Sequence, residues 1–444
     1  MERLALMPKY EAYKDSQVQW IGDIPANWHL EKAKWLFYKA DRKPLVDDDI
    51  VTCFRDGQVT LRKNRRTEGF TNALKEHGYQ RICKGDLVIH AMDAFAGAIG
   101  VSDSDGKSTP VYAACIPRKK GKVNSYYYAY YMRDLALSGF IVSLAKGIRE
   151  RSTDFRFNDF AELLLPFPDY EEQTRIANFL DKKTAQIDDA ISIKEKQINL
   201  LKEHKQIIIQ QAVTQGLDPN VPMKDSGVDW IGKIPAHWVL KKIKHVTSKI
   251  GSGVTPTGGG STYLDDGIPL LRSQNIHFDR IDLTDVARIS NKTHEGMSNS
   301  KVKKGDVLLN ITGGSIGRCY YVDSSDEMNV NQHVCIVRPN KIIKTVFLNA
   351  VLASEIGQGQ IWYFQQGGGR EGLNFQALKN FYIALPPEAQ QVEIAEYIDE
   401  LEKEFYSAIQ IQLMQIEKLK EYKTTLINSA VTGKIKITPE MVEQ

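Results

Sequence analysis

The chain has 444 residues, with 58 lysines and arginines against 55 aspartates and glutamates, so its formal net charge is only +3. This length and the 42% hydrophobic fraction predict two or three folded units. The small net charge excludes attraction of the whole molecule to nucleic acid, so any DNA-binding face must come from local clusters of basic residues.

Neither a leader nor a membrane span is expected, because apolar runs stay short of the roughly 18 residues that a span needs. The five cysteines are odd in number and widely spaced, which is typical of buried thiols in a reducing cytosol. The nine histidines are scattered without metal-ligand spacing. We therefore expect a soluble, cytoplasmic protein without a metal site.

The first predicted unit covers residues 1–170. It mixes short β-type runs such as Asp86–His90 with helical stretches such as Tyr126–Ala145, which predicts an α+β fold. Two basic clusters in this unit are candidates for DNA contact, and solvated loops are the alternative for each. Their candidate residues are Arg62, Lys63, Arg65 and Arg66, and Lys146, Arg149 and Arg151.

Residues 171–216 are predicted to form a long helix, the first of two helical spacers. Apolar residues recur at alternating steps of four and three, which is the seam of a coiled coil. The seam residues are Leu180, Ile187, Ile191, Ile198, Leu201 and Ile208, interrupted by polar residues such as Lys194 and Lys205.

The second predicted unit covers residues 217–387 and is again α+β. Arg272, Ser273, Gln274 and Asn275 group side chain types that recognise guanine and adenine edges, with a capped turn and an internal hydrogen-bond network as the alternative. Glycine-rich loops at 251–260 and 365–371 allow close approach to a phosphate, and Arg370 at the end of the second is a further candidate.

Residues 388–433 repeat the helical pattern as a second spacer, and residues 434–444 are predicted to be a C-terminal tail. The seam of the second helix consists of Ile398, Phe405, Ile409, Ile416, Leu419 and Leu426. An apolar seam of this length needs a partner, and the two helices are each other's expected partner. If the second unit is compact, its exit lies near its entrance, which predicts an antiparallel pair.

An internal repeat underlies this organisation. Asp15–Lys34 and Asp225–Lys244 are identical at thirteen of twenty positions, and the match returns at Lys84-Gly-Asp86 with Lys304-Gly-Asp306. The Lys-Gly-Asp segments are interpreted as scaffold turns. The shared Trp-Ile-Gly-x-Ile-Pro-Ala-x-Trp motif is interpreted as packing, because two tryptophans and a proline bury well. A common framework thus carries different inserts in its two copies.

Enzyme signatures are missing from the sequence. No phosphate loop, dinucleotide fingerprint, His-Glu-x-x-His or Gly-x-Ser-x-Gly motif is present, nor the Asn/Asp-Pro-Pro-Tyr motif of amino-methyltransferases. The chain is predicted to be a binding protein without catalytic residues.

Nearly the whole chain resembles the specificity subunits of type I restriction-modification systems. The resemblance rests on the repeated entry motif at 225–238, Ile268–Ile276, Lys304–Asn310, the Gln-x-x-Ile-Ala starts of both helices and their Ala-Val-Thr ends. One departure is Gln215-Gly216, where the second copy has Gly433-Lys434. The resemblance implies two target-recognition domains that read the halves of a split, asymmetric DNA site, and paired helices that act as a ruler.

The same resemblance implies that the helices dock two methyltransferase subunits, which restriction and translocase subunits join. Cofactors are expected in the partners alone: S-adenosylmethionine, ATP and Mg²⁺. Two alternatives remain open, namely a single-chain restriction-modification enzyme, which would need catalytic motifs, and a coiled-coil adaptor, which would not bind duplex DNA in a salt-dependent way.

Overall fold

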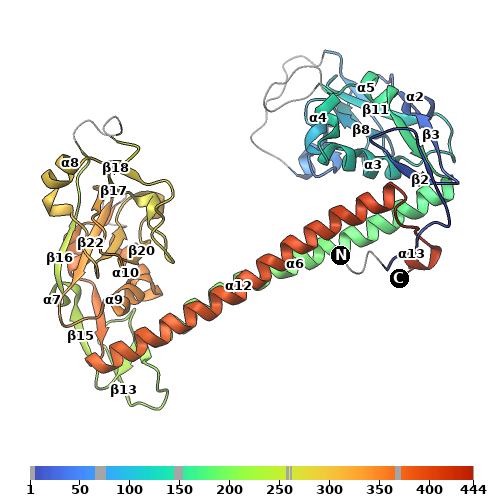
Figure 1. Ribbon diagram of the computed structural model, residues 1–444. Coiled ribbons are helices and arrows are strands. Elements are labelled where there is room, and N and C mark those ends of the chain that lie inside the picture. Colours follow the sequence, from blue (N-terminus) through green and yellow to red (C-terminus); the bar gives the residue numbers. More distant parts are fainter. Residues whose placement is uncertain are drawn as a thin grey trace. The chain divides into compact units, whose positions relative to one another are not determined.

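The computed structural model (Figure 1) describes residues 6–65, 77–144, 154–256, 260, 263–365 and 372–443. The chain divides into two compact units, unit 1 with Met1–Glu195 and Leu413–Gln444, and unit 2 with Lys196–Gln412. Each unit therefore contains one of the α+β heads together with part of both long helices.

Unit 1 has twelve named strands among its described residues. They are β1 (Tyr13–Asp15), β2 (Asp23–Pro25), β3 (His29–Lys32), β4 (Phe37–Lys39), β5 (Val51–Cys53), β6 (Val59–Leu61), β7 (Gln80–Ile82), β8 (Leu87–His90), β9 (Ile99–Val101), β10 (Gly106–Ser108), β11 (Tyr112–Pro117) and β12 (Leu164–Phe167). Its helices are α2 (Ala33–Leu36), α3 (Ser125–Leu137), α4 (Phe140–Leu144), α5 (Phe157–Glu162) and α13 (Pro439–Glu443), with 3-10 turns η1 (Arg62–Asn64) and η2 (Ala94–Ala96).

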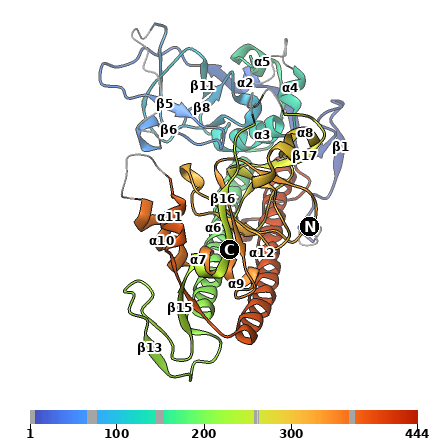
Figure 2. The same cartoon turned by 90° about the vertical axis from the view of Figure 1, so that its left-hand side faces the viewer.

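The main sheet of unit 1 is antiparallel, with the strand order β4-β11-β8-β9. Helix α3 packs against β8 and β9 of this sheet. The hairpin β5-β6 (Figure 2) is a separate small sheet, and so are the pairs β7-β10, β3-β12 and β1-β2.

Unit 2 repeats this plan with different insertions. Its strands are β13 (Met223–Asp225), β14 (Lys233–Pro235), β15 (Val239–Lys242), β16 (Thr247–Ser252), β17 (Ile268–Leu271), β18 (Ala287–Ile289), β19 (Val307–Asn310), β20 (Cys319–Tyr321), β21 (Asn329–Val330), β22 (Val334–Pro339) and β23 (Tyr382–Leu385). Its helices are α7 (Ile243–Val246), α8 (Asn291–Gly296), α9 (Thr345–Ala353), α10 (Glu355–Gln365) and α11 (Phe375–Lys379), with η4 (Ser273–Asn275), η5 (Ser298–Ser300) and η6 (Gly313–Ser315). The main sheet, β16-β22-β19-β20, has the same antiparallel order as its counterpart in unit 1.

The Lys-Gly-Asp segments are turns that lead into the central strands. Gly85 and Gly305 adopt φ values of +91° and +90°, a conformation that a residue with a Cβ rarely adopts. Asp86 accepts a hydrogen bond from the Cys83 backbone N–H at 2.8 Å, and Asp306 accepts one from Lys303 at 2.7 Å. The apolar runs that follow are the buried strands β8 and β19, as the scaffold interpretation predicts.

The second tryptophan of the motif packs in the core of each unit, as predicted, whereas the first tryptophan is only partly covered. Trp28 and Trp238 are 0% and 1% exposed, whereas Trp230 is 47% exposed. Trp20 stacks on Phe140 with ring centroids 4.3 Å apart, and Trp230 stacks on Tyr363 at 5.9 Å. The first tryptophan of each motif lies in the turn between two short strands, so it covers a neighbouring helix from outside rather than filling the core.

The predicted long helices are α6 (Tyr170–Gln215) and α12 (Glu388–Val431), against predicted spacers at 171–216 and 388–433. In unit 1 Lys423 of α12 pairs with Asp188 at 2.7 Å, and Lys194 hydrogen-bonds Gln415. In unit 2 Lys205 lies 3.9 Å from Glu402. In unit 2 the rings of His204 and Phe405 are also 5.7 Å apart. Residue numbers therefore rise along α6 as they fall along α12 in both units, so the helices are antiparallel.

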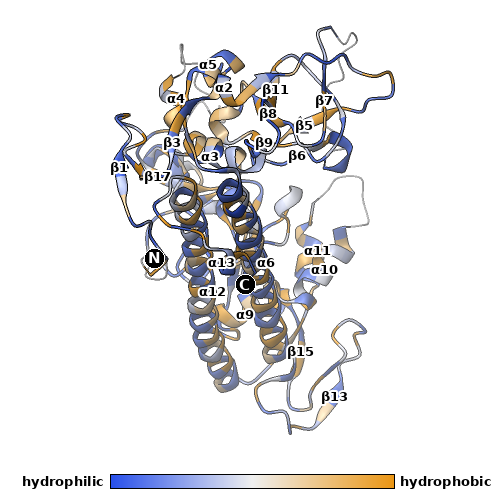
Figure 3. Cartoon of the chain, turned by 90° about the vertical axis from the view of Figure 1, so that its right-hand side faces the viewer, coloured by the Kyte–Doolittle hydropathy of each residue, from blue (hydrophilic) through white to orange (hydrophobic). Residues whose placement is uncertain are grey.

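The residues of the predicted seam are buried or partly buried on α6 and α12, the two long helices in Figure 3. Leu180, Ile187, Ile198, Ile398, Ile416 and Leu426 are buried. Ile191, Leu201, Ile208, Phe405, Ile409 and Leu419 are partly buried. Ile209 and Leu401, which the heptad count leaves out, are also buried. None of the helices in the described part of the chain combines the length and apolarity that crossing a bilayer requires.

The segment predicted to be a C-terminal tail is part of the core of unit 1. Ile435 and Ile437 are 4% and 1% exposed, and the Lys436 backbone N–H donates to the Pro8 carbonyl at 2.7 Å. Arg175 of α6 donates to the Ile437 carbonyl at 2.8 Å. The two ends of the chain therefore meet in unit 1, because alternating apolar residues after α12 bury beside α6.

Candidate nucleic-acid interface

Loops that are far apart in the sequence converge at one end of the main sheet of unit 2. The Ile311 N–H, just after β19, donates to the His333 carbonyl at 3.0 Å, and the Leu373 N–H donates to Ile311 at 2.8 Å. The Gly253 N–H, just after β16, donates to the Asn331 carbonyl at 3.1 Å. We call this set, residues 253–256, 271–275, 311–315, 331–333 and 372–374, the loop edge of unit 2.

Four polar side chains form a network on this loop edge. Thr312 Oγ1 and His333 Nδ1 are 2.7 Å apart, and Gln332 Nε2 lies 2.9 Å from His333 Nε2. Thr255 Oγ1 donates to Gln332 Oε1. Gln332 and Thr255 are exposed, so the network faces solvent. Its position among glycine-rich loops suits contact with an extended polar ligand.

Of the predicted residues Arg272–Asn275, the structure assigns Asn275 to the fold and not to a ligand. Asn275 is 3% exposed; its Oδ1 accepts from the Arg272 N–H at 2.9 Å and its Nδ2 donates to the Asp282 carbonyl at 2.9 Å. Both ends of the amide are occupied inside the turn, so the prediction of base contact by Asn275 is corrected. The capped-turn alternative describes this residue.

The other members of that group lie at the surface of the loop edge. Gln274 is exposed, and the Ser273 carbonyl accepts from Asn310 Nδ2 at 2.7 Å, which ties η4 to the end of β19. The Arg272 guanidinium lies 5.7 Å from the centre of the Tyr263 ring and donates to the Asp285 carbonyl at 3.4 Å. Arg272, Ser273 and Gln274 therefore remain candidates for DNA contact.

Unit 1 has an equivalent loop edge. The Ala91 N–H donates to the Val111 carbonyl at 3.0 Å, and the Phe155 N–H donates to Ala91 at 3.1 Å. These two bonds match those of Ile311 with His333 and of Leu373 with Ile311. A cavity of about 230 Å³ opens here, lined by Lys39, Tyr112 and Arg156 among others. The two units thus present one backbone frame with unlike side chains.

The histidine at the end of β8 is part of this frame in unit 1. Burial lowers the pKa of His90, against the opposing effect of Asp93. His90 Nδ1 accepts from the Asp93 N–H at 3.0 Å, and the ring lies edge-on to Tyr112 at 4.5 Å. A neutral ring that accepts at Nδ1 supports the loop after β8.

The first predicted basic cluster lies on and after the hairpin β5-β6. Lys63 pairs with Asp49 at 2.5 Å, and Arg65 pairs with Asp56 at 2.6 Å while covering the Phe54 ring. Arg62 Nε donates to Thr52 Oγ1 at 3.3 Å. Lys63 and Arg65 form ion pairs with aspartates and Arg62 bonds to the hairpin, so the positive charge of this cluster is partly neutralised in the free protein.

Sequence reasoning missed a basic residue that connects this hairpin with the loop edge of unit 1. Arg55, in the hairpin turn, pairs with Asp93 at 2.7 Å and is 63% exposed. The predicted residues Arg66, Lys146, Arg149, Arg151 and Arg370 lie outside the described residues. Of the sequence candidates, Arg62, Lys63 and Arg65 follow the hairpin β5-β6 of unit 1, and Arg272–Gln274 lie on the loop edge of unit 2.

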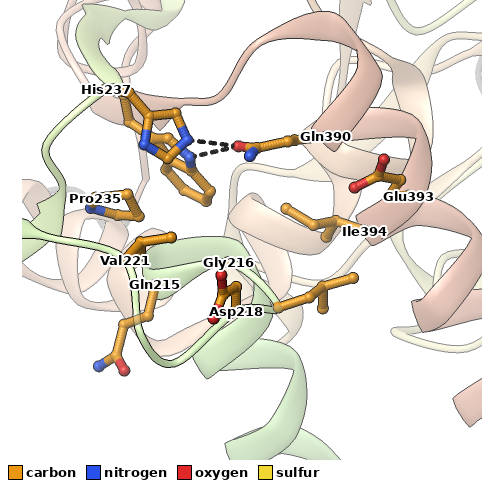
Figure 4. Close-up of a pocket in the computed structure, with 11 residues that line it drawn as sticks. Gln215, Gly216, Asp218, Val221, Pro235, His237, Gln390, Glu393 and Ile394 are labelled. Atoms are coloured by element: carbon orange, nitrogen blue, oxygen red, sulfur yellow. Dashed lines mark hydrogen bonds between the residues drawn. The ribbon is translucent and has the colours of Figure 1, made fainter.

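A separate cavity of about 210 Å³ lies in unit 2 where α6 ends and α12 begins (Figure 4). Gln390 Oε1 accepts from Trp238 Nε1 at 2.9 Å and lies 2.9 Å from His237 Nε2. In unit 1 the corresponding carboxylate of Glu172 accepts from Trp28 at 3.0 Å and from Tyr10 at 2.7 Å. The residue of unit 2 that corresponds to Tyr10 is Asn220, so unit 2 has no aromatic ring at this position.

Groups with reactive chemistry do not gather in the described part of the chain. No cluster of three His, Cys, Asp or Glu there is placed to hold a metal ion. All five cysteines are free thiols, and four are buried. Burial raises the pKa of Cys319 and of Cys335 to about 12, which keeps these thiols protonated and unreactive.

Comparison with known proteins shows similarity over both units. Residues 236–417 match the family described as type I restriction modification DNA specificity domain. The chain is 31% identical to the specificity subunit of the type I restriction enzyme EcoBI of Escherichia coli, over 56% of this chain and 55% of that protein. It is 27% identical to the specificity subunit of the type I restriction enzyme MjaVIII of Methanocaldococcus jannaschii, over 72% of each chain.

A solved structure shares the fold. Its description is "Structural basis underlying complex assembly and conformational transition of the type I R-M system". The match covers 92% of this chain and 98% of that chain, with a TM-score of 0.69. The sequence identity is 14%, so this likeness concerns the fold. The match to the Escherichia coli protein spans about half of that relative's length.

Proposed function

We propose that this chain, like the specificity subunits of type I restriction-modification systems to which it is similar, binds one bipartite, asymmetric DNA sequence and brings partner subunits to it. Each unit reads one half of the site through its loop edge. The observation that carries the proposal is the pair of loop edges, which share backbone bonds but differ in side chains. Two copies of one frame with unlike contacts suit two unlike half-sites.

The long helices are proposed to set the gap between the half-sites and to dock two methyltransferase subunits. A continuous helix of 46 residues is about 70 Å long. In unit 2 Leu200 and Ile207 of α6 are 63% and 46% exposed, beside a shallow cavity that they line with His204. Apolar residues away from the seam support a partner surface on this part of the helix.

The chain itself is proposed to be non-catalytic. Methylation of adenine would use S-adenosylmethionine bound to the methyltransferase subunits, and ATP and Mg²⁺ would serve the restriction and translocase subunits. A protein that acts on chromosomal DNA with these partners works in the cytoplasm. A coiled-coil adaptor without DNA recognition is the second reading, and the two differ in salt-dependent affinity for duplex DNA.

The test is to co-express the chain with the methyltransferase encoded beside it and to map methylated adenines across the host genome. We expect methylation at one gapped motif whose halves differ. The purified complex should bind a duplex that carries the motif, and its affinity should fall steeply as salt rises. A soluble, assembled complex that leaves no motif-specific methylation and binds no duplex would establish the adaptor reading instead.

A further inference from the structure

Gln332 lies at the tip of the turn between β21 and β22, at the centre of the loop edge of unit 2. Its amide is held on two sides: Oε1 accepts from Thr255 and Nε2 lies 2.9 Å from His333 Nε2. Thr255 follows β16, 77 residues earlier in the chain. A long polar side chain that is exposed yet oriented by two neighbours loses little freedom when it meets a ligand.

The backbone around Gln332 is equally well held. The Asn331 side chain is buried, and its Oδ1 accepts from the His333 N–H at 3.0 Å. A Cβ on Gly253 would come within 1.6 Å of the Val330 carbonyl oxygen, so only glycine lets the segment that carries Thr255 pass so close. The turn therefore presents Gln332 from a rigid base.

The hydrogen bonds determine which groups of Gln332 stay available. Because the amide nitrogen donates to His333 Nε2, that imidazole atom is the acceptor and Nδ1–H donates to Thr312 Oγ1 at 2.7 Å. One amide N–H and one lone pair on Oε1 then remain. A neighbouring donor and acceptor on one planar amide match N7 and the N6 amino group of adenine in the major groove.

We propose that Gln332 reads an adenine in the half-site bound by unit 2, with His333, Thr312 and Thr255 holding its amide in the reading orientation. This inference rests on the proposed function and adds a residue and a base to it. The aligned backbone bonds place Pro110 of unit 1 at the position of Gln332, next to Val111 at the position of His333. Proline has no side-chain donor or acceptor, so the two units must differ at this base.

The experiment uses the full chain assembled with its methyltransferase subunits, first with the native sequence. Genome methylation mapping gives the native motif. If no motif appears, the proposed function is wrong, and the role of Gln332 is rejected together with it. Gln332→Ala, Gln332→Glu and the control Gln376→Ala are then mapped in the same way. Gln376 is exposed on α11, which packs on α7 before the start of β16, whereas Thr255 follows the other end of that strand.

With Gln332→Ala we expect a single adenine–thymine position in one half of the motif to become degenerate, while the other half is unchanged. Competition binding with duplexes that differ only there should show the native preference for adenine, about tenfold or more, disappear. Gln332→Glu keeps acceptors and loses the donor, so preference at that position should move toward cytosine. Gln376→Ala should reproduce the native motif.

Three results would overturn the inference and leave the proposed function standing. These are an unchanged motif and affinity for both Gln332 variants, a change at a guanine–cytosine position, and equal weakening on all sequences without a change in preference. Thermal unfolding and assembly with the methyltransferase subunits, measured for each variant, separate loss of recognition from loss of folding.

Discussion

At the scale of single residues, one aspartate in each unit determines how the central strand begins. Asp306 is fully buried, accepts from the Lys303 N–H, and forms two hydrogen bonds with Arg338, at 2.6 and 2.8 Å. The hydrogen bond with Asp306 is the main reason why the pKa of Arg338 is raised. In unit 1 Asp86 has the same place and pairs with Arg42, which comes from a different part of the chain.

Replacement of Asp306 by alanine is expected to lower the free energy of unfolding of unit 2 by about 3 kcal/mol, because Arg338 loses its carboxylate partner and a backbone N–H is left unpaired. Urea unfolding followed by the fluorescence of the tryptophans measures this. Lys304→Ala, two residues earlier and exposed, is the control and should change stability by less than about 0.5 kcal/mol. Similar effects of both substitutions would contradict the assigned role of the aspartate.

Asn275 and Gln274 are adjacent, yet they are expected to respond oppositely to truncation. Asn275→Ala removes partners from the Arg272 N–H and the Asp282 carbonyl, so we expect a loss of about 1–2 kcal/mol in unfolding free energy and no change in the methylated motif. Gln274→Ala should leave stability within about 0.5 kcal/mol and weaken binding of the motif duplex. Calorimetry and duplex titration separate the two, and the reverse pattern would make Asn275 the DNA contact.

At the scale of elements, the seam of the helix pair contains a carboxyl group that opposes folding at neutral pH. Burial raises the pKa of Glu402, and the attraction of Lys205 at 3.9 Å only partly offsets this. The folded protein therefore holds this proton at pH values where the unfolded chain, near its ordinary pKa of 4.5, has released it. Between those two pKa values stability falls as the pH rises.

Glu402→Gln is expected to raise the melting temperature at pH 7, since it mimics the protonated form. The difference from the native chain should vanish as the pH is lowered through the raised pKa of Glu402. Glu404→Gln, on the exposed side of α12, should show no such pH dependence. Melting curves at several pH values test this, and a variant less stable than the native chain at pH 7 would mean that the ion pair outweighs burial.

The long helices also show how far the apolar period of a sequence predicts which residues are buried. The predicted seam residues from Leu180 to Ile198 are buried or partly buried, because the period of apolar residues is a property of the chain itself. Near the end of α6 the burial moves to Ile209, where the helix meets the core of unit 2. That change of face comes from the head and is invisible in the spacing.

At the scale of the whole molecule, the proposed division of labour separates the bases that are read from the distance between them. Deleting seven residues from each helix at facing places, Ile191–Gln197 and Gln412–Lys418, keeps the seam in phase and leaves Leu200, His204 and Ile207 in place; Lys194 hydrogen-bonds Gln415 within the deleted segments. About 10 Å of helix is lost.

The deletion should shorten the gap of the methylated motif by at most about three base pairs and leave both half-sites unchanged. Methylation mapping of the assembled complex measures this directly. A complex that assembles, methylates and keeps the native gap would show that the helices do not set the distance, whereas altered half-site bases would show that they take part in recognition.

The sequence by itself determined the repeat and the α+β heads with two long helices, because identity at fixed offsets, the apolar period and turn residues are properties of the chain itself. It also led to Arg272–Gln274 as surface residues of the second head. It placed the last residues, 434–444, outside the core, although Ile435 and Ile437 are buried among residues from the other end of the chain.

Only the tertiary structure decided which polar side chains meet. Thr255 and Gln332 are 77 residues apart and come together because β16 pairs with β22, a long-range pairing that no local spacing reveals. The structure also shows that Asn275 is buried, because its amide accepts a hydrogen bond within the turn instead of facing a ligand. Side-chain convergence depends on how strands associate in space, so recognition residues on loops remain hidden until the sheet is built.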